Sequence, residues 1–120
     1  MSYESQIYIV KPHRGVIPGD CGLNFAEIVS IFRLGYVDGI YEFVRHYPES
    51  SCYIYEDDGD TEITQDRYGE PLREIPIREL IFELNRLNDN SKRCDISAVV
   101  SALIHYSYSP RKLVALHYGY

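Results

Sequence analysis

The sequence predicts a single α+β domain over residues 1–120, with elements in the order β-α-α-β-β-α-α-β. We expect a small mixed sheet with the helices packed on one of its faces. A chain of 120 residues with 45% hydrophobic and 25% charged residues has the size and composition of one soluble globular domain. Short runs rich in β-branched and aromatic residues alternate with stretches whose apolar residues recur every three or four positions, and Gly or Pro separates them.

The N-terminal part predicts a strand followed by a helix. Residues 6–10 form a run of Gln, Ile, Tyr, Ile and Val that is typical of a buried strand. A loop then leads to Asn24, where we expect a helix to start because the Asn24 side chain and Glu27 can form a capping box. Gly35 is the expected end of this helix. Its expected apolar face consists of Phe25, Ile28, Val29 and Phe32.

The middle of the chain predicts a short helix and a β-hairpin. Asp38 can cap the short helix, and Pro48 prevents its continuation. The side chains expected to point inward from it are Ile40, Phe43, Val44 and Tyr47. Residues 52–56 predict a strand, and Asp58-Gly59 favours a hairpin turn because both residues tolerate a positive φ. Residues 61–64 are expected to return as the second strand of this hairpin.

The C-terminal part predicts two longer helices and a closing strand. Pro76 suits the first position of a helix, and the residues after it follow the i, i+3, i+4, i+7 pattern. These apolar residues are Ile77, Leu80, Ile81, Leu84 and Leu87. Asp95 is expected to cap the next helix, which Pro110 ends. Its apolar face would consist of Ile96, Val99, Val100, Leu103 and Tyr106. The closing strand at residues 113–118 and the first strand are both continuously apolar, so we place them in the middle of the sheet.

The negative charge of the protein is concentrated in one segment. The net charge of the chain is −6, and the segment from Glu49 to Glu70 holds eight acidic residues against Arg67 alone, or −7. The remaining 11 basic and 10 acidic residues nearly balance. Such a field attracts a basic partner and repels phosphate, so we expect no direct binding of nucleic acid. The candidate partner-binding residues are Tyr53, Tyr55, Glu56, Asp57, Asp58, Asp60, Glu62 and Tyr68.

Two other interpretations of the acidic segment lead to different conclusions. A calcium loop counted from Asp58 would need Gly at its sixth position and Glu at its twelfth, where this chain has Ile63 and Gly69. The calcium motif therefore fails. The remaining alternative is a solvated turn whose charges keep the edge strands from pairing with other chains.

The sequence contains no recognisable metal-binding or catalytic motif. Its three cysteines include no C-x-x-C, its four histidines have no metal-ligand spacing, and it has neither a Walker motif nor G-x-G-x-x-G. We therefore expect no catalytic residues, no metal, no cofactor and no enzymatic activity. No apolar run is long enough to span a membrane and no secretory signal is visible, so we expect a cytoplasmic protein without a membrane partner.

A second candidate site combines basic, tyrosine and histidine residues. Lys11–Gly15 directly follows the first strand, and a basic loop at the end of a strand can hold a phosphate. Tyrosine rings close to arginines would add stacking for the base of a nucleotide. The candidate ligand-binding residues are Lys11, His13, Arg14, Arg45, His117 and Tyr118. The alternative interpretation of Lys11–Gly15 is an ordinary polar loop.

Two short blocks of the chain resemble small proteins encoded by phage and prophage genomes. They are Asp66–Leu72 with Ile75-Pro76 after it, and Leu116–Tyr120. The resemblance implies a role in the conflict between phage and bacterium, inside the cytoplasm of a bacterial host. Small acidic proteins of this kind include anti-CRISPR proteins, toxin-immunity proteins and proteins that sequester nucleotide immune signals. The resemblance assigns no role to any single residue.

These observations favour a non-catalytic anti-defence binding protein. The first hypothesis is stoichiometric inhibition of a host protein with a basic surface, steered by the acidic hairpin. The first alternative is sequestration of a nucleotide-derived immune signal in a pocket of Tyr, Arg and His, by a homo-oligomer. The second alternative is a toxin-immunity protein.

Overall fold

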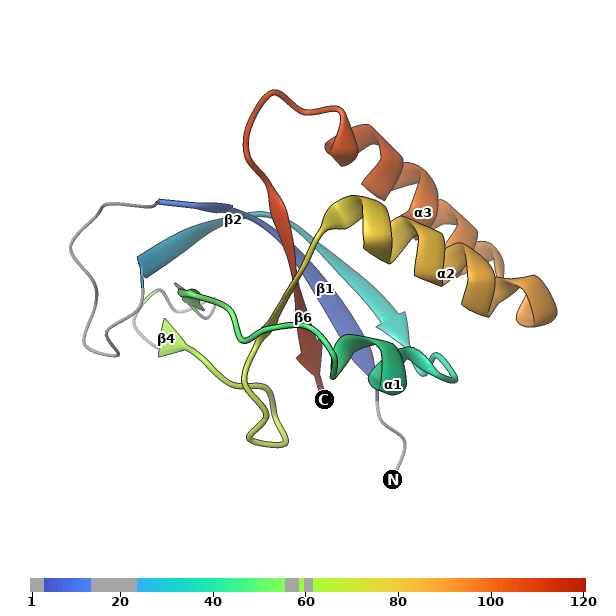
Figure 1. Ribbon diagram of the computed structural model, residues 1–120, viewed down its shortest axis with the longest axis horizontal. Helices are drawn as coiled ribbons and strands as arrows, with labels where there is room; N and C mark the ends of the chain where they lie inside the picture. The colour runs from blue at the N-terminus through green and yellow to red at the C-terminus, as the bar shows by residue number, and fades with distance from the viewer. Residues whose placement is uncertain (1–3, 14–23, 56–58, 60–61) are drawn as a thin grey trace.

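A curled six-stranded sheet with helices on one face organises the chain (Figure 1). The computed structural model describes residues 4–13, 24–55, 59 and 62–120. Its elements are β1 (Ser5–Pro12), β2 (Asn24–Gly35), α1 (Ile40–Val44), β3 (Cys52–Tyr55), β4 (Glu62–Ile63), β5 (Arg73–Ile75), α2 (Ile77–Ser91), α3 (Cys94–Ser107) and β6 (Val114–Gly119). The strand order is β4-β3-β2-β1-β6-β5, with β2 and β3 parallel and every other neighbouring pair antiparallel. The expected α+β class with a mixed sheet is therefore confirmed.

The first and last strands lie in the middle of the sheet, as expected. β1 pairs with β2 on one side and with β6 on the other. Successive residues of a strand point to opposite faces, so both faces of these central strands must be covered by apolar groups. Ile7 and Ile9 point toward the helices, whereas Tyr8 and Val10 belong to the core on the opposite face.

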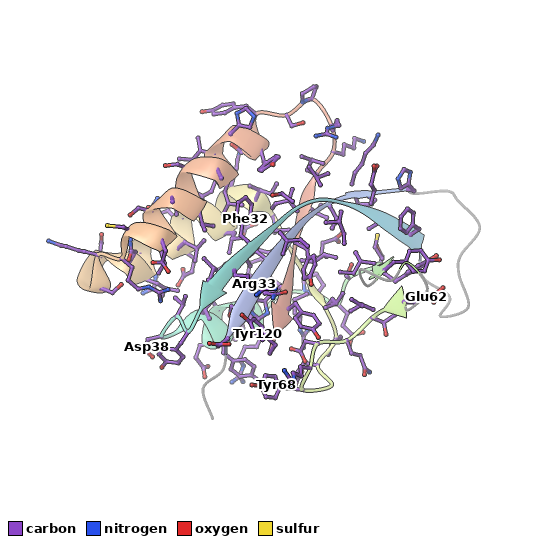
Figure 2. The ribbon with its side chains drawn as sticks, turned by 180° about the vertical axis from the view of Figure 1, so that it is seen from behind. Phe32, Arg33, Asp38, Glu62, Tyr68 and Tyr120 are labelled. Carbon is purple, nitrogen blue, oxygen red and sulfur yellow. The ribbon has the colours of Figure 1, made fainter. Side chains whose placement is uncertain are left out.

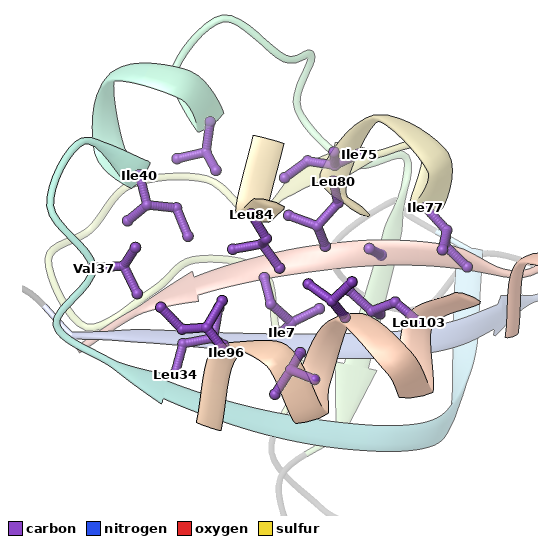
Figure 3. Packing of buried hydrophobic residues seen from close by; sticks show 14 of the residues in the cluster. Ile7, Leu34, Val37, Ile40, Ile75, Ile77, Leu80, Leu84, Ile96 and Leu103 are labelled. Atoms are coloured by element: carbon purple, nitrogen blue, oxygen red, sulfur yellow. The ribbon is translucent and has the colours of Figure 1, made fainter. Parts of the chain in front are cut away.

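The larger core lies between the sheet and the pair α2 and α3 (Figure 3). Leu80 and Leu84 of α2 and Leu103 of α3 are fully buried there. Full burial of one such side chain stabilises the fold by about 1.5–3 kcal/mol. The expected inward faces of both helices are thus confirmed.

A smaller core lies on the other face of the sheet. It consists of Val10, Ala26, Cys52, Ile54, Leu72 and Leu116. β2 pairs with β3 only at Asn24↔Cys52 and Phe25↔Tyr53, so β3 and β4 can curl away from the plane of the central strands (Figure 1). This curl brings β3 over the central strands and closes the smaller core.

The helix expected from Asn24 is wrong, because residues 24–35 form the long strand β2. A β-bulge explains the misleading pattern. Ile9 pairs with Ser30 and Val10 pairs with Ile28, so Val29 is an extra residue in β2. Val29 and Phe32 consequently both pack toward the helices, and their spacing of three imitates a helical face. The β-branched residues of the segment favour the strand.

Three smaller expectations also change. β5 was not expected, and it forms because Arg73–Ile75 pairs with residues 115–117 of β6. α2 begins at Ile77, one residue after Pro76. α3 begins at Cys94, and the residue before it is Arg93, so Asp95 lies in the first turn and does not cap the helix.

The expected hairpin joins β3 and β4. Ile54 pairs with Ile63 and Tyr55 with Glu62, which is the register that a two-residue turn at Asp58-Gly59 requires. Gly59 has a φ of +76°, in the left-handed region that such a turn uses. The other turn residues, 56–58 and 60–61, lie outside the described part of the chain. None of the described helices combines the length and the apolar character that crossing a membrane requires.

Candidate functional site

The structure does not bring together the candidate ligand-binding residues that it describes, which are all of the six except Arg14. His117 lies in the core with 3% of its surface exposed, and its Nε2 is 2.9 Å from the Ser5 hydroxyl. Burial lowers the pKa of His117 to about 4, so its ring is neutral near neutral pH. Arg45 and His117 line the same cavity, but its volume of about 30 Å³ has room for little more than a water molecule. These two residues therefore cannot form a nucleotide pocket here.

The other members of that set lie elsewhere. The ring of His13 stacks on Phe25 at 5.4 Å, and its Nε2 is 3.5 Å from the Glu27 carboxylate. Tyr118 lies on the face of the sheet that carries the smaller core and makes an edge contact with Tyr8. Lys11 pairs with Glu27 at the far end of β1, and Arg14 lies outside the described residues. The described members of the set, Lys11, His13, Arg45, His117 and Tyr118, thus do not form a single site.

The candidate partner-binding residues also separate into groups. Tyr53 is only 4% exposed and packs against Phe25 and Tyr55, so it is a core residue and not an anchor for a partner. Tyr55 and Glu62 are half-buried, whereas Tyr68 is 41% exposed. The carboxylates Glu56, Asp57, Asp58 and Asp60 lie outside the described residues.

One acidic residue of the same segment has a structural role. Asp66 is buried, and its Oδ1 accepts hydrogen bonds from the backbone N–H groups of Tyr68 and Glu70, at 2.8 and 3.0 Å. This arrangement fixes the turn before β5. Asp66 is therefore not part of a surface that a basic partner could contact.

A cleft of about 570 Å³ lies where the start of α2, the end of α3 and the loop into β6 meet. Its apolar lining includes Ile77, Leu113 and the ring of Tyr106. The cationic side chains of Arg78, Arg111 and Lys112 also line it. The volume is within the range of natural small-molecule sites, and a mostly apolar wall with a few charged groups is their usual composition.

The wall on the α1 side is held in place by the strand beneath it. The Arg73 guanidinium donates to the Tyr47 carbonyl at 2.8 Å, and the Glu74 N–H donates to the Pro48 carbonyl at 3.1 Å. The Tyr47 hydroxyl donates to the Glu79 carboxylate at 2.9 Å. Burial together with this carboxylate raises the pKa of Tyr47 to about 12, so the hydroxyl stays protonated. This wall of the cleft is thus built before any ligand arrives.

The three cations of the cleft are not neutralised by the protein. Among the residues that the structure describes, Arg78, Arg111 and Lys112 have no carboxylate within the 4.0 Å of an ion pair. All three are exposed. Glu74 is the acidic residue of the lining, so the cleft is positive in a protein whose net charge is −6.

A second hollow of about 290 Å³ adjoins the cleft and shares Tyr106, Ser109 and Arg111 with it. It adds the rings of His105 and Tyr108, and Tyr108 is 78% exposed. Positive charge and accessible aromatic rings therefore lie next to one another. Such a combination can hold an anion that carries a flat ring.

The serine hydroxyl groups of the cleft make local hydrogen bonds. Its serines are engaged locally, because the Ser107 hydroxyl donates to the Ile104 carbonyl and the Ser109 hydroxyl accepts from the Arg111 N–H. The described residues that line the cleft include no histidine or cysteine. In the described part of the chain, no group of three His, Cys, Asp or Glu side chains is placed to hold a metal ion. Among the described lining residues, no serine is paired with a histidine that could act as its base.

Comparison of the chain with protein-family models, with curated proteins and with solved structures finds no match. The resemblance of two short blocks to phage proteins therefore stays a prediction.

Proposed function

We propose that this protein is a non-catalytic binding protein for a small nucleotide-type ligand, held in the cleft between α2, α3 and β6. The observation that carries this proposal is the cluster of Arg78, Arg111 and Lys112 around a cleft of about 570 Å³. Cations without carboxylate partners are costly to keep close together, since like charges repel. A phosphate would offset that repulsion and satisfy their N–H donors.

The chemistry of the cations favours phosphate over a single carboxylate. A guanidinium presents a planar fork of N–H donors that matches two phosphate oxygens, and a lysine adds a compact charge. Arg78 and the neighbouring pair Arg111 and Lys112 come from different elements, so together they can hold more than one face of a phosphate. The start of α2 adds the positive end of its helix dipole.

The aromatic residues beside the cleft supply the second part of the recognition. Tyr106 lines both hollows, and Tyr108 and His105 line the smaller one. Stacking of a base on such a ring stabilises binding by about 1–3 kcal/mol. In the bacterial cytoplasm that the phage resemblance implies, binding without turnover would remove a nucleotide-derived signal from circulation.

The proposal is tested by calorimetric titration of nucleotides, nucleosides and inorganic phosphate. We expect nucleotides to bind, and nucleosides to bind much more weakly because they lack the phosphate. Arg111→Gln should weaken nucleotide binding at least about tenfold, as expected for the loss of a charged hydrogen bond. Arg45→Gln removes the same charge from an exposed residue that pairs with Glu42, and it should bind as the native protein does. Absence of binding across the nucleotide panel, or equal losses in both variants, would contradict the proposal.

A second candidate is the stoichiometric inhibition of a host protein through the acidic segment, with toxin immunity as one form of it. It is favoured by the net −7 of Glu49–Glu70 and by Tyr68, which is 41% exposed next to this charge. Association would be faster at low salt. One titration separates the alternatives: an inhibitor saturates a host protein at a one-to-one ratio, a sequestering protein saturates with a nucleotide, and an enzyme turns over.

A further inference from the structure

β2 has an open edge along the part of the strand that runs beyond β3. β2 extends from Asn24 to Gly35, yet it pairs with β3 only at Asn24 and Phe25. In Figure 2, β2 continues well past the short strands β3 and β4 toward Arg33. One side of this continuation pairs with β1. The opposite side has no strand beside it in the described part of the chain.

The backbone groups on this edge can be identified from the hydrogen bonds of β1. Glu4 and Tyr120 exchange both of their backbone hydrogen bonds at 2.9 Å, and the register between β1 and β6 has no shift. Even-numbered residues of β1 therefore bond to β6, and odd-numbered residues bond to β2. Ile7 and Ile9 pair with Phe32 and Ser30. Ile31 lies between these two residues of β2, and Arg33 follows Phe32. The backbone N–H and C=O groups of Ile31 and Arg33 consequently point away from β1.

The far end of the edge is already closed by a side chain. The Arg93 guanidinium donates to the Leu34 carbonyl at 2.7 Å and also to the Tyr36 carbonyl. The open part of the edge is thus confined to the stretch that precedes Leu34.

This open stretch has only part of the usual protection of an edge strand. The bulge at Val29 and the charge of Arg33 lie on either side of Ile31, but the stretch contains neither Pro nor Lys, and Ile31 exposes 43% of its surface. Unpaired backbone groups beside an exposed Ile favour the addition of another strand.

We propose that the occupant of this edge is β2 of a second copy of the chain, paired antiparallel around a two-fold axis at Phe32. In this register Ile31 of one copy lies opposite Arg33 of the other, and each such pair exchanges two backbone hydrogen bonds. The stem of Arg33 can then cover Ile31. A two-fold axis makes both halves of the contact equivalent, as in most homodimers.

Two neighbouring registers are less favourable for physical reasons. A two-fold axis at Arg33 would place two guanidinium groups directly opposite each other, which destabilises a strand pair. An axis at Ile31 would carry the pairing into the bulge at Val29, where the ladder is irregular. With the axis at Phe32, the hydrogen-bonded pairs join Ile31 and Arg33, which both lie between the two register shifts of β2 at Val29 and Leu34.

The proposal is tested by sedimentation velocity across the micromolar to millimolar range. We expect the native protein to reach twice its mass of 13.9 kDa. Ile31→Lys should give the monomer, because the new charge faces Arg33 of the other copy. Phe82→Lys introduces the same charge at a side chain that is 71% exposed on α2, and this control should still dimerise. Native protein that stays monomeric throughout, or equal loss in both variants, would overturn the proposal.

A charge exchange tests the register itself. Combining Ile31→Lys with Arg33→Glu should restore the dimer, since the two new side chains would lie opposite each other with opposite charges. Arg33→Glu alone should dimerise, because Ile31 lies opposite it. Failure of the double variant to dimerise, while circular dichroism shows it folded, would rule out the two-fold axis at Phe32.

Discussion

His117 is a titratable side chain whose charged form is disfavoured by its position. It is 3% exposed, pairs across the sheet with Ile7, and has a pKa lowered by burial to about 4. In the unfolded chain a histidine has a pKa of about 6.5. Between these two values the unfolded state binds a proton that the folded state does not. The stability contributed by neutral His117 is therefore complete above this window and is lost as the pH falls through it.

We expect the free energy of unfolding to fall by about 2 kcal/mol between pH 7 and pH 5 because of this histidine. Urea unfolding at the two pH values measures the difference. His105→Gln removes an exposed histidine and should keep the full loss. His117→Gln should remove most of this loss of stability between pH 7 and pH 5, even though the variant is less stable than the native protein at pH 7. A native protein whose stability is flat from pH 7 to pH 5 would contradict this prediction.

Gly39 and Gly69 both adopt a positive φ, at +87° and +81°, but their surroundings differ. A Cβ on Gly39 would lie 3.0 Å from Leu87 Cδ2, whereas a Cβ on Gly69 would meet nothing within 4 Å. Gly69→Ala should therefore cost about 1 kcal/mol, the strain of the left-handed backbone alone. Gly39→Ala should cost more, about 2 kcal/mol, because it also crowds the start of α1 against α2. Equal losses of stability in the two variants, measured by thermal unfolding, would show that the Leu87 side chain moves aside without a cost in free energy.

At the level of the elements, the sequence predicts the helices and strands that a local residue pattern determines. α2 and α3 are confirmed because their apolar spacing matches the helical period and their inward residues, such as Leu84 and Leu103, are buried. β2 was missed because its bulge depends on pairing with β1, and no local pattern reports that pairing. β5 was missed for the same reason, since three residues form a strand only because β6 lies beside them.

The candidate site shows the same limit. Arg111 and Lys112 are adjacent in the loop between α3 and β6, directly after Pro110, whereas Arg78 lies on α2. Only the packing of α2 against α3 makes the three charges one cluster. The adjacent Arg111 and Lys112 between a helix and a strand are a signal of positive charge that the sequence does contain. The sequence does not reveal which other residues line the cleft opposite them.

Arg93 connects two elements that the sequence places far apart. Its guanidinium reaches the Leu34 carbonyl of β2 and also bonds the Asp95 carboxylate, with Nη2 at 2.6 Å from Oδ2. A lysine cannot make these contacts at once, because it lacks the planar fork. We expect Arg93→Lys to lower the free energy of unfolding by about 1–2 kcal/mol. Arg45→Lys, at an exposed pair with Glu42, should change it by less than about 0.5 kcal/mol in the same urea titration.

At the level of the whole molecule, two opposite charge features lie in different places. The acidic turn follows β3 in the sequence, and the basic cleft adjoins β6, three strands from β3 in the order of the sheet. Three strand spacings amount to about 14 Å along the sheet. Electrostatic interactions in water extend about 8 Å at physiological ionic strength and about 30 Å at 0.01 M. The acidic segment should therefore repel an anionic ligand only at low salt.

This separation gives a test that depends on the proposed nucleotide site. Replacing Asp57, Asp58 and Asp60 together by Asn should accelerate nucleotide association about two- to fivefold at 0.01 M salt, and leave it unchanged at physiological salt. Replacing the same residues by Glu preserves the charge and serves as the control. Stopped-flow association rates at the two ionic strengths measure the effect. A gain that persists at physiological salt would mean that the acidic turn touches the ligand directly, and no gain at low salt would mean that the ligand binds without a net negative charge.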